Sequence, residues 1–222
     1  MEFGGKEVVM ARHDILQGEL VDHIDLAVTA LKDGYVIVAP LENSYALVAD
    51  AFFHDAVRAL HVLRGDALGV AAQVAIANKN SIDGIARSIP DSARTLMENF
   101  WPGALSLNLK PQLGLSWDLG DANSLDQISV RVPSAAFILE ILKKTGPLAI
   151  ASAAPVGAPP IRDCENLDFS EVEVTAVFTA GVLPQSAAST VVDFTGSSPR
   201  IVREGVIPRS EITALVSDIS GD

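Results

Sequence analysis

A short, unbroken apolar run at residues 35–39 (YVIVA) constrains the fold most strongly, because Pro40 ends it after five residues. A run this short and rich in β-branched residues favours a strand that is covered on both faces. Directly before it, residues 21–33 carry apolar side chains at helical spacing, and Gly34 follows as a stop. A buried strand next to an amphipathic helix predicts layers of helix and sheet.

The rest of the chain continues this alternation of helical and strand patterns. Helices are predicted over residues 54–64, from Asp91 or Ser92 as the cap to about Phe100, and over 135–145 with Ser134 as the cap. Strands are predicted over residues 72–77, 104–110, 128–132, 148–151, 189–194 and 200–203, and loops over 114–127 and 155–170. The pattern indicates an α/β or α+β protein in one domain.

Composition limits the classes of function. The 222 residues include 28 acidic and 16 basic ones, so the net charge of −12 opposes non-specific binding to nucleic acid or anionic lipid. No apolar stretch approaches the ~20 residues that span a bilayer, and residues 1–20 lack the apolar core of a secretory signal. The single cysteine, Cys164, excludes an internal disulfide framework, and the histidines show no metal-ligand spacing. We therefore expect a cytoplasmic protein without a structural metal.

Four segments carry short motifs, in order along the chain. They are Pro40–Leu47 (PLENSYAL), Trp101–Ser106 (WPGALS), Val130–Pro133 (VRVP) with Pro147–Ala154 (PLAIASAA), and Ser189–Asp193 (STVVD) with Arg203–Gly205 (REG). Their order and spacing over about residues 20–208 resemble the YrdC family of threonylcarbamoyl-AMP synthases, whose first two motifs read Pro-Thr-Asp-Thr-Val-Tyr-Gly-Leu and Trp-Pro-Gly-Pro-Leu-Thr. The resemblance implies one YrdC-like domain over residues 1–222, with a twisted mixed sheet, flanking helices and a large concave cleft.

The resemblance also implies an activity and its residues. The family starts the threonylcarbamoyladenosine modification of tRNA: threonine carbamate, formed with bicarbonate, attacks the α-phosphorus of ATP, and pyrophosphate leaves. Mg²⁺ would accompany ATP, and partner proteins of tRNA modification would follow the reaction. The implied catalytic residues are Arg64 and Ser152. The implied nucleotide-binding residues are Arg64, Ser106, Arg131, Ile150, Ser152, Ala154, Ser189 and Arg203, and the implied amino-acid-binding residues are Asn43, Tyr45 and Ser189.

In the first motif only Pro40, Tyr45 and Leu47 match the family. Two of the four positions whose side chains face the phosphates and the carbamate in the family are replaced by unlike residues, Asp66 and Ala154. Its Lys-x-Arg reads Arg64-Gly65-Asp66 here, and its Ser-x-Asn reads Ser152-Ala153-Ala154. If Asp66 faces phosphate, two like charges ~4 Å apart repel by about 4 kcal/mol at an effective dielectric of about 20. A Mg²⁺ ion that bridges the carboxylate and a phosphate reverses that sign. Arg131, inside a predicted strand, needs either an anionic ligand or a buried carboxylate as its partner.

Two other functions remain open from the sequence. One is a divergent YrdC paralogue, weakened in catalysis by the changes at Asp66 and Ala154, that binds a nucleotide or another small anion. The other is an RNA-binding module, which the net charge of −12 disfavours.

Overall fold

The computed structural model describes residues 11–165, 167, 174–217 and 219–221. Its helices are α1 (Leu20–Lys32), α2 (His54–Arg64), α3 (Asp91–Phe100), α4 (Ala136–Thr145), α5 (Arg209–Leu215) and the 3₁₀ helix η1 (Lys79–Gly84). Its strands are β1 (Ala11–Asp14), β2 (Val36–Pro40), β3 (Tyr45–Asp50), β4 (Gln73–Ala75), β5 (Ala86–Arg87), β6 (Leu105–Pro111), β7 (Ile128–Arg131), β8 (Leu148–Ser152), β9 (Val174–Thr179), β10 (Thr190–Asp193), β11 (Arg200–Arg203) and β12 (Ser220–Gly221). No helix in these ranges is long and apolar enough to cross a membrane.

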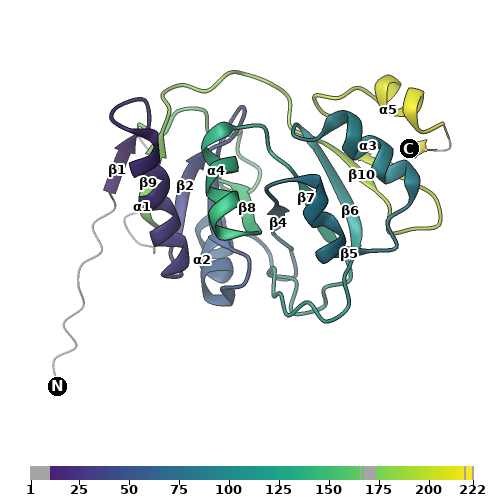
Figure 1. Ribbon diagram of the computed structural model, residues 1–222, viewed down its shortest axis with the longest axis horizontal. Helices are drawn as coiled ribbons and strands as arrows, with labels where there is room; N and C mark the ends of the chain where they lie inside the picture. The colour runs from purple at the N-terminus through teal and green to yellow at the C-terminus, as the bar shows by residue number, and fades with distance from the viewer. Residues whose placement is uncertain (1–10, 166, 168–173, 218, 222) are drawn as a thin grey trace.

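The strands form one mixed sheet in the order β1-β9-β2-β3-β8-β4-β7-β6-β10-β11-β12, with β5 paired to β6 (Figure 1). Antiparallel pairs join β2 to β3, β3 to β8 and β8 to β4 in the centre. Parallel pairs join β4 to β7 and β6 to β10. The centre of the sheet thus brings together segments that are more than 100 residues apart in sequence.

Two hydrophobic cores lie on opposite faces of the sheet. Along β2, Val36 and Val38 pack into one core, whereas Ile37 and Ala39 pack into the other. Helix α2 covers the first face, and α1 and α4 lie side by side over the second (Figure 1). The apolar run at residues 35–39 is therefore covered on both faces, as its composition predicts.

Most predicted elements are confirmed, but the two predicted helix caps are wrong. Helix α3 follows Pro90, and Asp91 is its first helical residue rather than a capping one. Helix α4 follows Ala135, and no side chain caps it. The backbone N–H and the hydroxyl of Ser134 both donate to the Glu42 carboxylate instead.

The sequence did not predict five of the strands and two of the helices: β1, β3, β5, β9, β12, α5 and the 3₁₀ helix η1. Strand β3 lies inside the Pro40–Leu47 motif and runs on to Asp50 as the antiparallel partner of β2. Residues 155–165 form the predicted loop, while 166 and 168–170 of that prediction lie outside the described residues.

Candidate active site

A cavity of about 440 Å³ opens over the centre of the sheet. In the register of the strands, Ala46 of β3 lies opposite Ser152 of β8, and Gln73 of β4 lies opposite Ile150. All four line the cavity. Ala46 and Ile150 also belong to the core beneath α1 and α4, so the cavity occupies the same face of the sheet. Its volume falls within the range of about 300–1,000 Å³ typical of small-molecule sites.

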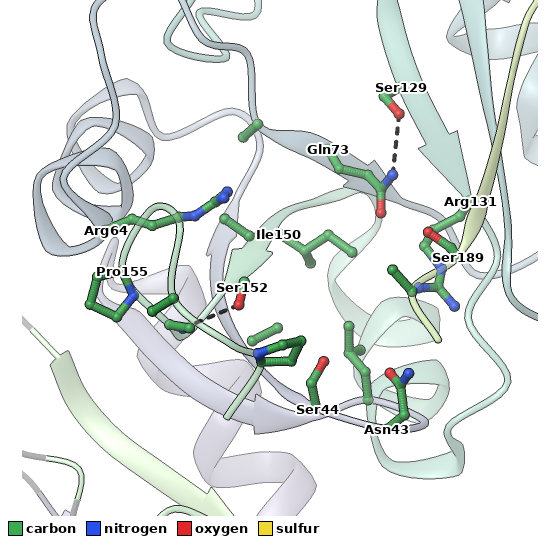
Figure 2. Close-up of a pocket in the computed structure, with 18 of the residues that line it drawn as sticks. Asn43, Ser44, Arg64, Gln73, Ser129, Arg131, Ile150, Ser152, Pro155 and Ser189 are labelled. Carbon is green, nitrogen blue, oxygen red and sulfur yellow. Dashed lines mark hydrogen bonds between the residues drawn. The ribbon is translucent and has the colours of Figure 1, made fainter. Parts of the chain in front are cut away.

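The wall of the cavity is cationic. Arg64, Arg131 and Arg203 line it, and the described lining residues include no Asp or Glu. Figure 2 shows Arg64 and Pro155 on one side of the cavity, and Arg131 and Ser189 on the opposite side. Because the whole chain carries a net charge of −12, this concentration of guanidinium groups is a local feature. Its chemistry suits a ligand with several negative charges.

The sequence left two partners open for Arg131, and the structure shows a carboxylate. Nη2 of Arg131 donates to Oε1 of Glu42 at 2.7 Å and to the carbonyl oxygen of Gly103 at 3.0 Å. Burial alone would raise the pKa of Glu42, but the charge of Arg131 and hydrogen bonds from Ser134 outweigh burial and lower that pKa. Arg131 still lines the cavity, so Glu42 fixes one edge of its guanidinium while another edge stays available.

Arg203 is held against Ser189. Its Nε donates to the Ser189 carbonyl oxygen at 3.0 Å, and its Nη2 donates to the Ser189 hydroxyl, also at 3.0 Å. Burial, and then the nearby charge of Arg131, lower the pKa of Arg203. Two guanidinium groups that repel each other in this way favour an anion placed between them.

Ser152, Ala154 and Ile150 line the cavity where β8 ends. The Ala154 backbone N–H donates to the Ser152 hydroxyl at 3.2 Å, which leaves the Ser152 hydroxyl proton available to a ligand. The Ala154 methyl group contributes apolar wall at the position where the family carries an amide. Arg64 and Ser152, the two predicted catalytic residues, thus share one cavity.

Of the three residues predicted to bind the amino acid, two lie on the wall and one does not. Asn43 and Ser189 line the cavity, and Asn43 Nδ2 donates to the Ala187 carbonyl oxygen at 2.8 Å. Tyr45 is fully buried on the other face of β3. Its hydroxyl donates to the Gly181 carbonyl oxygen at 2.7 Å and accepts from the Ala180 N–H at 2.8 Å. Tyr45, which the resemblance implied for amino-acid binding, therefore does not line the cavity.

Ser106 also lies behind the wall rather than on it. It is fully buried, and its hydroxyl accepts a hydrogen bond from Gln73 Nε2 at 2.9 Å and lies 3.2 Å from the Ser189 hydroxyl. Ser106, which the resemblance implied for nucleotide binding, therefore does not line the cavity. Ser106 supports Ser189 from beneath.

Asp66 does not face the cavity either. Its side chain is 4% exposed, and Oδ2 lies 2.7 Å from Nδ1 of His61. Both alternatives drawn from the sequence, repulsion of a phosphate and a Mg²⁺ bridge to it, require a carboxylate on the wall. The structure turns this carboxylate inward, so neither applies.

Sequence reasoning missed Gln73 and Ser129. Gln73 Nε2 donates to the hydroxyls of Ser106 and Ser129, at 2.9 and 3.1 Å, so its Oε1 is left to accept from a ligand (Figure 2). One signal was present: Gln73 opens a strand whose next residues, Val74 and Ala75, are apolar and buried. A long polar side chain at the start of such a strand needs partners.

Comparisons with known proteins agree with this geometry. The Sua5, YciO and YrdC family model, described as "Telomere recombination", matches residues 29–205. A Mycobacterium tuberculosis protein named "Putative threonylcarbamoyl-AMP synthase" is 38% identical over 191 residues, which are 86% of this chain and 87% of that protein. The threonylcarbamoyl-AMP synthase of Bacillus subtilis is 28% identical over 200 residues, covering 88% of this chain and 57% of that protein.

Two solved structures share the fold. P. abyssi Sua5 complexed with L-threonine superposes with a TM-score of 0.83 at 25% identity, over 96% of this chain and 62% of that one. E. coli YciO superposes with a TM-score of 0.73 at 24% identity, over 89% of this chain and 94% of that one. The P. abyssi protein is thus longer than the region that this chain matches. The sequence match and the fold lead to one conclusion: the chain belongs to the Sua5, YciO and YrdC family.

Proposed function

We propose that this protein is a threonylcarbamoyl-AMP synthase that acts on ATP, L-threonine and bicarbonate for the threonylcarbamoyladenosine modification of tRNA. The observation that carries the proposal is a cavity with three arginines and no described acidic residue on its wall, in a chain with a net charge of −12. Such a site selects polyanions, and ATP, the substrate that the family resemblance implies, is one of them. The name of the M. tuberculosis relative supports the same activity.

The reaction has two balanced steps. The threonine amine attacks the carbon of bicarbonate, a C–N bond forms, and water leaves to give the carbamate. A carbamate oxygen then attacks the α-phosphorus of ATP, an O–P bond forms, and the bond to the β-phosphate oxygen breaks. Pyrophosphate takes the electron pair of that bond. Neither step needs a protein nucleophile, so the protein acts by positioning and by charge neutralisation.

The arrangement of the wall suggests roles for its residues. Arg64 and Ser152 bind the phosphates on one side. On the opposite side Arg131 and Arg203 neutralise charge, and the Ser189 hydroxyl supplies a hydrogen bond. Ile150 and Ala154 supply apolar wall for the nucleotide. Asn43 lies at the amino-acid end, and the free Oε1 of Gln73 accepts a hydrogen bond from a substrate N–H or O–H.

Mg²⁺ fits this site only as part of the Mg–ATP substrate. The described lining residues offer hydroxyl and amide oxygens but no carboxylate, so phosphate oxygens would supply the charged ligands. Bound Mg²⁺ would offset phosphate charge during attack. We place the reaction in the cytoplasm, in one domain of residues 1–222, with its product passed to partner proteins of tRNA modification.

The test is pyrophosphate release from Mg–ATP, with the adenylate product detected by mass spectrometry. We expect release to require threonine and bicarbonate together. Arg64→Met should reduce kcat/KM by about 100-fold, because it removes a charge-assisted contact to phosphate in the transition state. Arg94→Met is the matched control: Arg94 pairs with Asp83 and does not line this cavity, so its rate should equal that of the unmodified protein.

Two outcomes would contradict the proposal. Tight binding of ATP without threonine-dependent pyrophosphate release would favour the catalytically weakened paralogue. Equal rates for Arg64→Met and Arg94→Met would remove Arg64 from the site.

A further inference from the structure

Helix α2 ends in the Arg64-Gly65-Asp66 triplet, and the side chains of Arg64 and Asp66 point in different directions. Gly65 adopts a left-handed conformation (φ 71°), and the N–H groups of Gly65 and Asp66 donate to the carbonyl oxygens of Val62 and His61. Arg64 consequently lines the cavity, whereas Asp66 folds back against the helix. Asp66 reaches Nδ1 of His61 with one oxygen and lies 3.7 Å from Nε of Arg64 with the other.

The contacts of His61 fix where its protons are. Nε2 lies 2.8 Å from the carbonyl oxygen of Leu119. A carbonyl oxygen only accepts hydrogen bonds, so Nε2 carries a proton. At 2.7 Å from a carboxylate oxygen, Nδ1 must also share a proton, because two lone pairs do not face each other at that distance. The pair therefore contains a proton between His61 and Asp66 and has no net charge.

The surroundings of His61 hold this arrangement in place. A Cβ atom built on Gly120 would lie 2.2 Å from His61 Nε2, so the loop after Leu119 packs directly against the ring. Both partners are largely shielded from solvent, with side chains 13% and 4% exposed for His61 and Asp66. An enclosed, satisfied pair of this kind gives Asp66 a fixed position behind Arg64.

We propose that Asp66, held by its hydrogen bond with His61, is a positioning residue that holds the Arg64 guanidinium at the phosphate side of the cavity. Nε of Arg64 is buried and makes no hydrogen bond among the described residues, so its ion pair with Asp66 is the contact that anchors that end of the side chain. The terminal nitrogens are left for the ligand. An arginine held in advance loses less side-chain entropy when phosphate binds.

This inference rests on the proposed function, since it assigns Arg64 to phosphate. It also gives the change from Lys-x-Arg to Arg-x-Asp a physical meaning. In place of two cations that face the ligand, this chain has one cation and an internal carboxylate that orients it.

The first measurement is ¹⁵N NMR of the imidazole of His61 in the unmodified protein. We expect Nε2 to carry a proton and Nδ1 to share one with the Asp66 carboxylate, as the two contacts require. In Asp66→Asn the amide can donate to Nδ1, so the ring should become neutral with its proton on Nε2 alone. This NMR result reports on the His61–Asp66 hydrogen bond alone and does not depend on catalytic turnover.

The second measurement is the affinity for Mg–ATP, by calorimetry and as KM. Asp66→Asn should weaken ATP binding by about fivefold, with kcat and the KM for threonine nearly unchanged, because the variant loses orientation rather than charge. His61→Gln should weaken ATP binding further, since it leaves a carboxylate whose charge only Arg64 offsets. Adding Asp66→Asn to it should restore part of the loss. Asp83→Asn, which breaks a remote Asp–Arg pair, should change nothing.

The outcomes separate the two proposals. A His61 ring whose Nδ1 shares no proton with Asp66 in the unmodified protein, or unchanged or tighter ATP binding in Asp66→Asn, would overturn the positioning role. Weaker ATP binding in Asp66→Asn together with no threonine-dependent turnover in the unmodified protein would support the positioning role and reject the synthase.

Discussion

Tyr45 and Ala46 are adjacent in β3, and their side chains point to opposite faces of the sheet. Side chains alternate along a strand, so when Ala46 faces the cavity Tyr45 must face the other core. There the Tyr45 hydroxyl joins β3 to the backbone at Ala180 and Gly181, far along the chain. Burial is the main reason that the pKa of Tyr45 is raised, and the phenol therefore stays neutral. Its role is to anchor that segment.

Tyr45→Phe separates anchoring from substrate binding. We expect the free energy of unfolding to fall by about 1 kcal/mol, because two backbone groups lose a hydrogen-bond partner. The KM for threonine should stay within about twofold of the unmodified value, because the hydroxyl does not reach the cavity. Urea titration and steady-state kinetics measure the two quantities.

Tyr35→Phe is the matched control, since Tyr35 is 38% exposed and lies outside the cavity. Unchanged stability of Tyr45→Phe with a large rise in the KM for threonine would return Tyr45 to the amino-acid site.

At the level of elements, the turn between β2 and β3 connects three parts of the molecule. Glu42, in that turn, pairs with Arg131 of β7 and accepts two hydrogen bonds from Ser134 just before α4. The turn thereby holds the Arg131 guanidinium on one wall of the cavity. It also holds the start of α4, one of the helices that cover the sheet. A carboxylate whose pKa is lowered by such contacts makes stability depend on pH.

Glu42→Gln tests that dependence. Ionised Glu42 stabilises the folded protein above its ordinary pKa of 4.5, and this contribution is lost as the pH falls through the lowered pKa. We expect Glu42→Gln to cost about 2 kcal/mol at pH 7, because it leaves the buried Arg131 uncompensated. The cost should shrink below pH 4.5, as measured by denaturant unfolding from pH 7 to pH 3.

Glu140→Gln provides the control, since Glu140 pairs with Lys143 on an exposed part of α4. A cost for Glu42→Gln that stays constant from pH 7 to pH 3 would contradict an electrostatic origin.

Elements with strong local signals could be predicted from the sequence, and side-chain directions could not. Helix α2 has apolar side chains at helical spacing and Arg64 at its end, and its predicted bounds, 54–64, match the structure. The family motif placed Asp66 near the ligand, but the left-handed turn at Gly65 and the contact with His61 turn it inward. Ser106 is hidden because Ser189, 83 residues later, packs over it. Such outcomes depend on register and on distant contacts, which a local pattern does not contain.

For the whole molecule, the main electrostatic feature is a cationic cavity inside an anionic protein. Three arginines line a cavity of about 440 Å³, while the chain as a whole carries a charge of −12. A compact polyphosphate can reach these arginines. A nucleic-acid duplex is too wide to enter and meets the outer surface, whose net charge repels it.

We therefore expect ATP to bind and duplex RNA not to bind with comparable strength. Fluorescence anisotropy with a labelled duplex should give a Kd weaker than about 10⁻⁵ M at physiological salt, because few counterions are released from RNA by an anionic surface. ATP added in excess should leave that weak signal unchanged, since the two ligands use different surfaces. Tight duplex binding that falls steeply with salt and is displaced by ATP would show that the arginines of the cavity extend to an RNA-binding surface. The same result would restore the RNA-binding module as the function. Competition between ATP and RNA, together with a strong salt dependence, requires a continuous basic path from the cavity to the exterior.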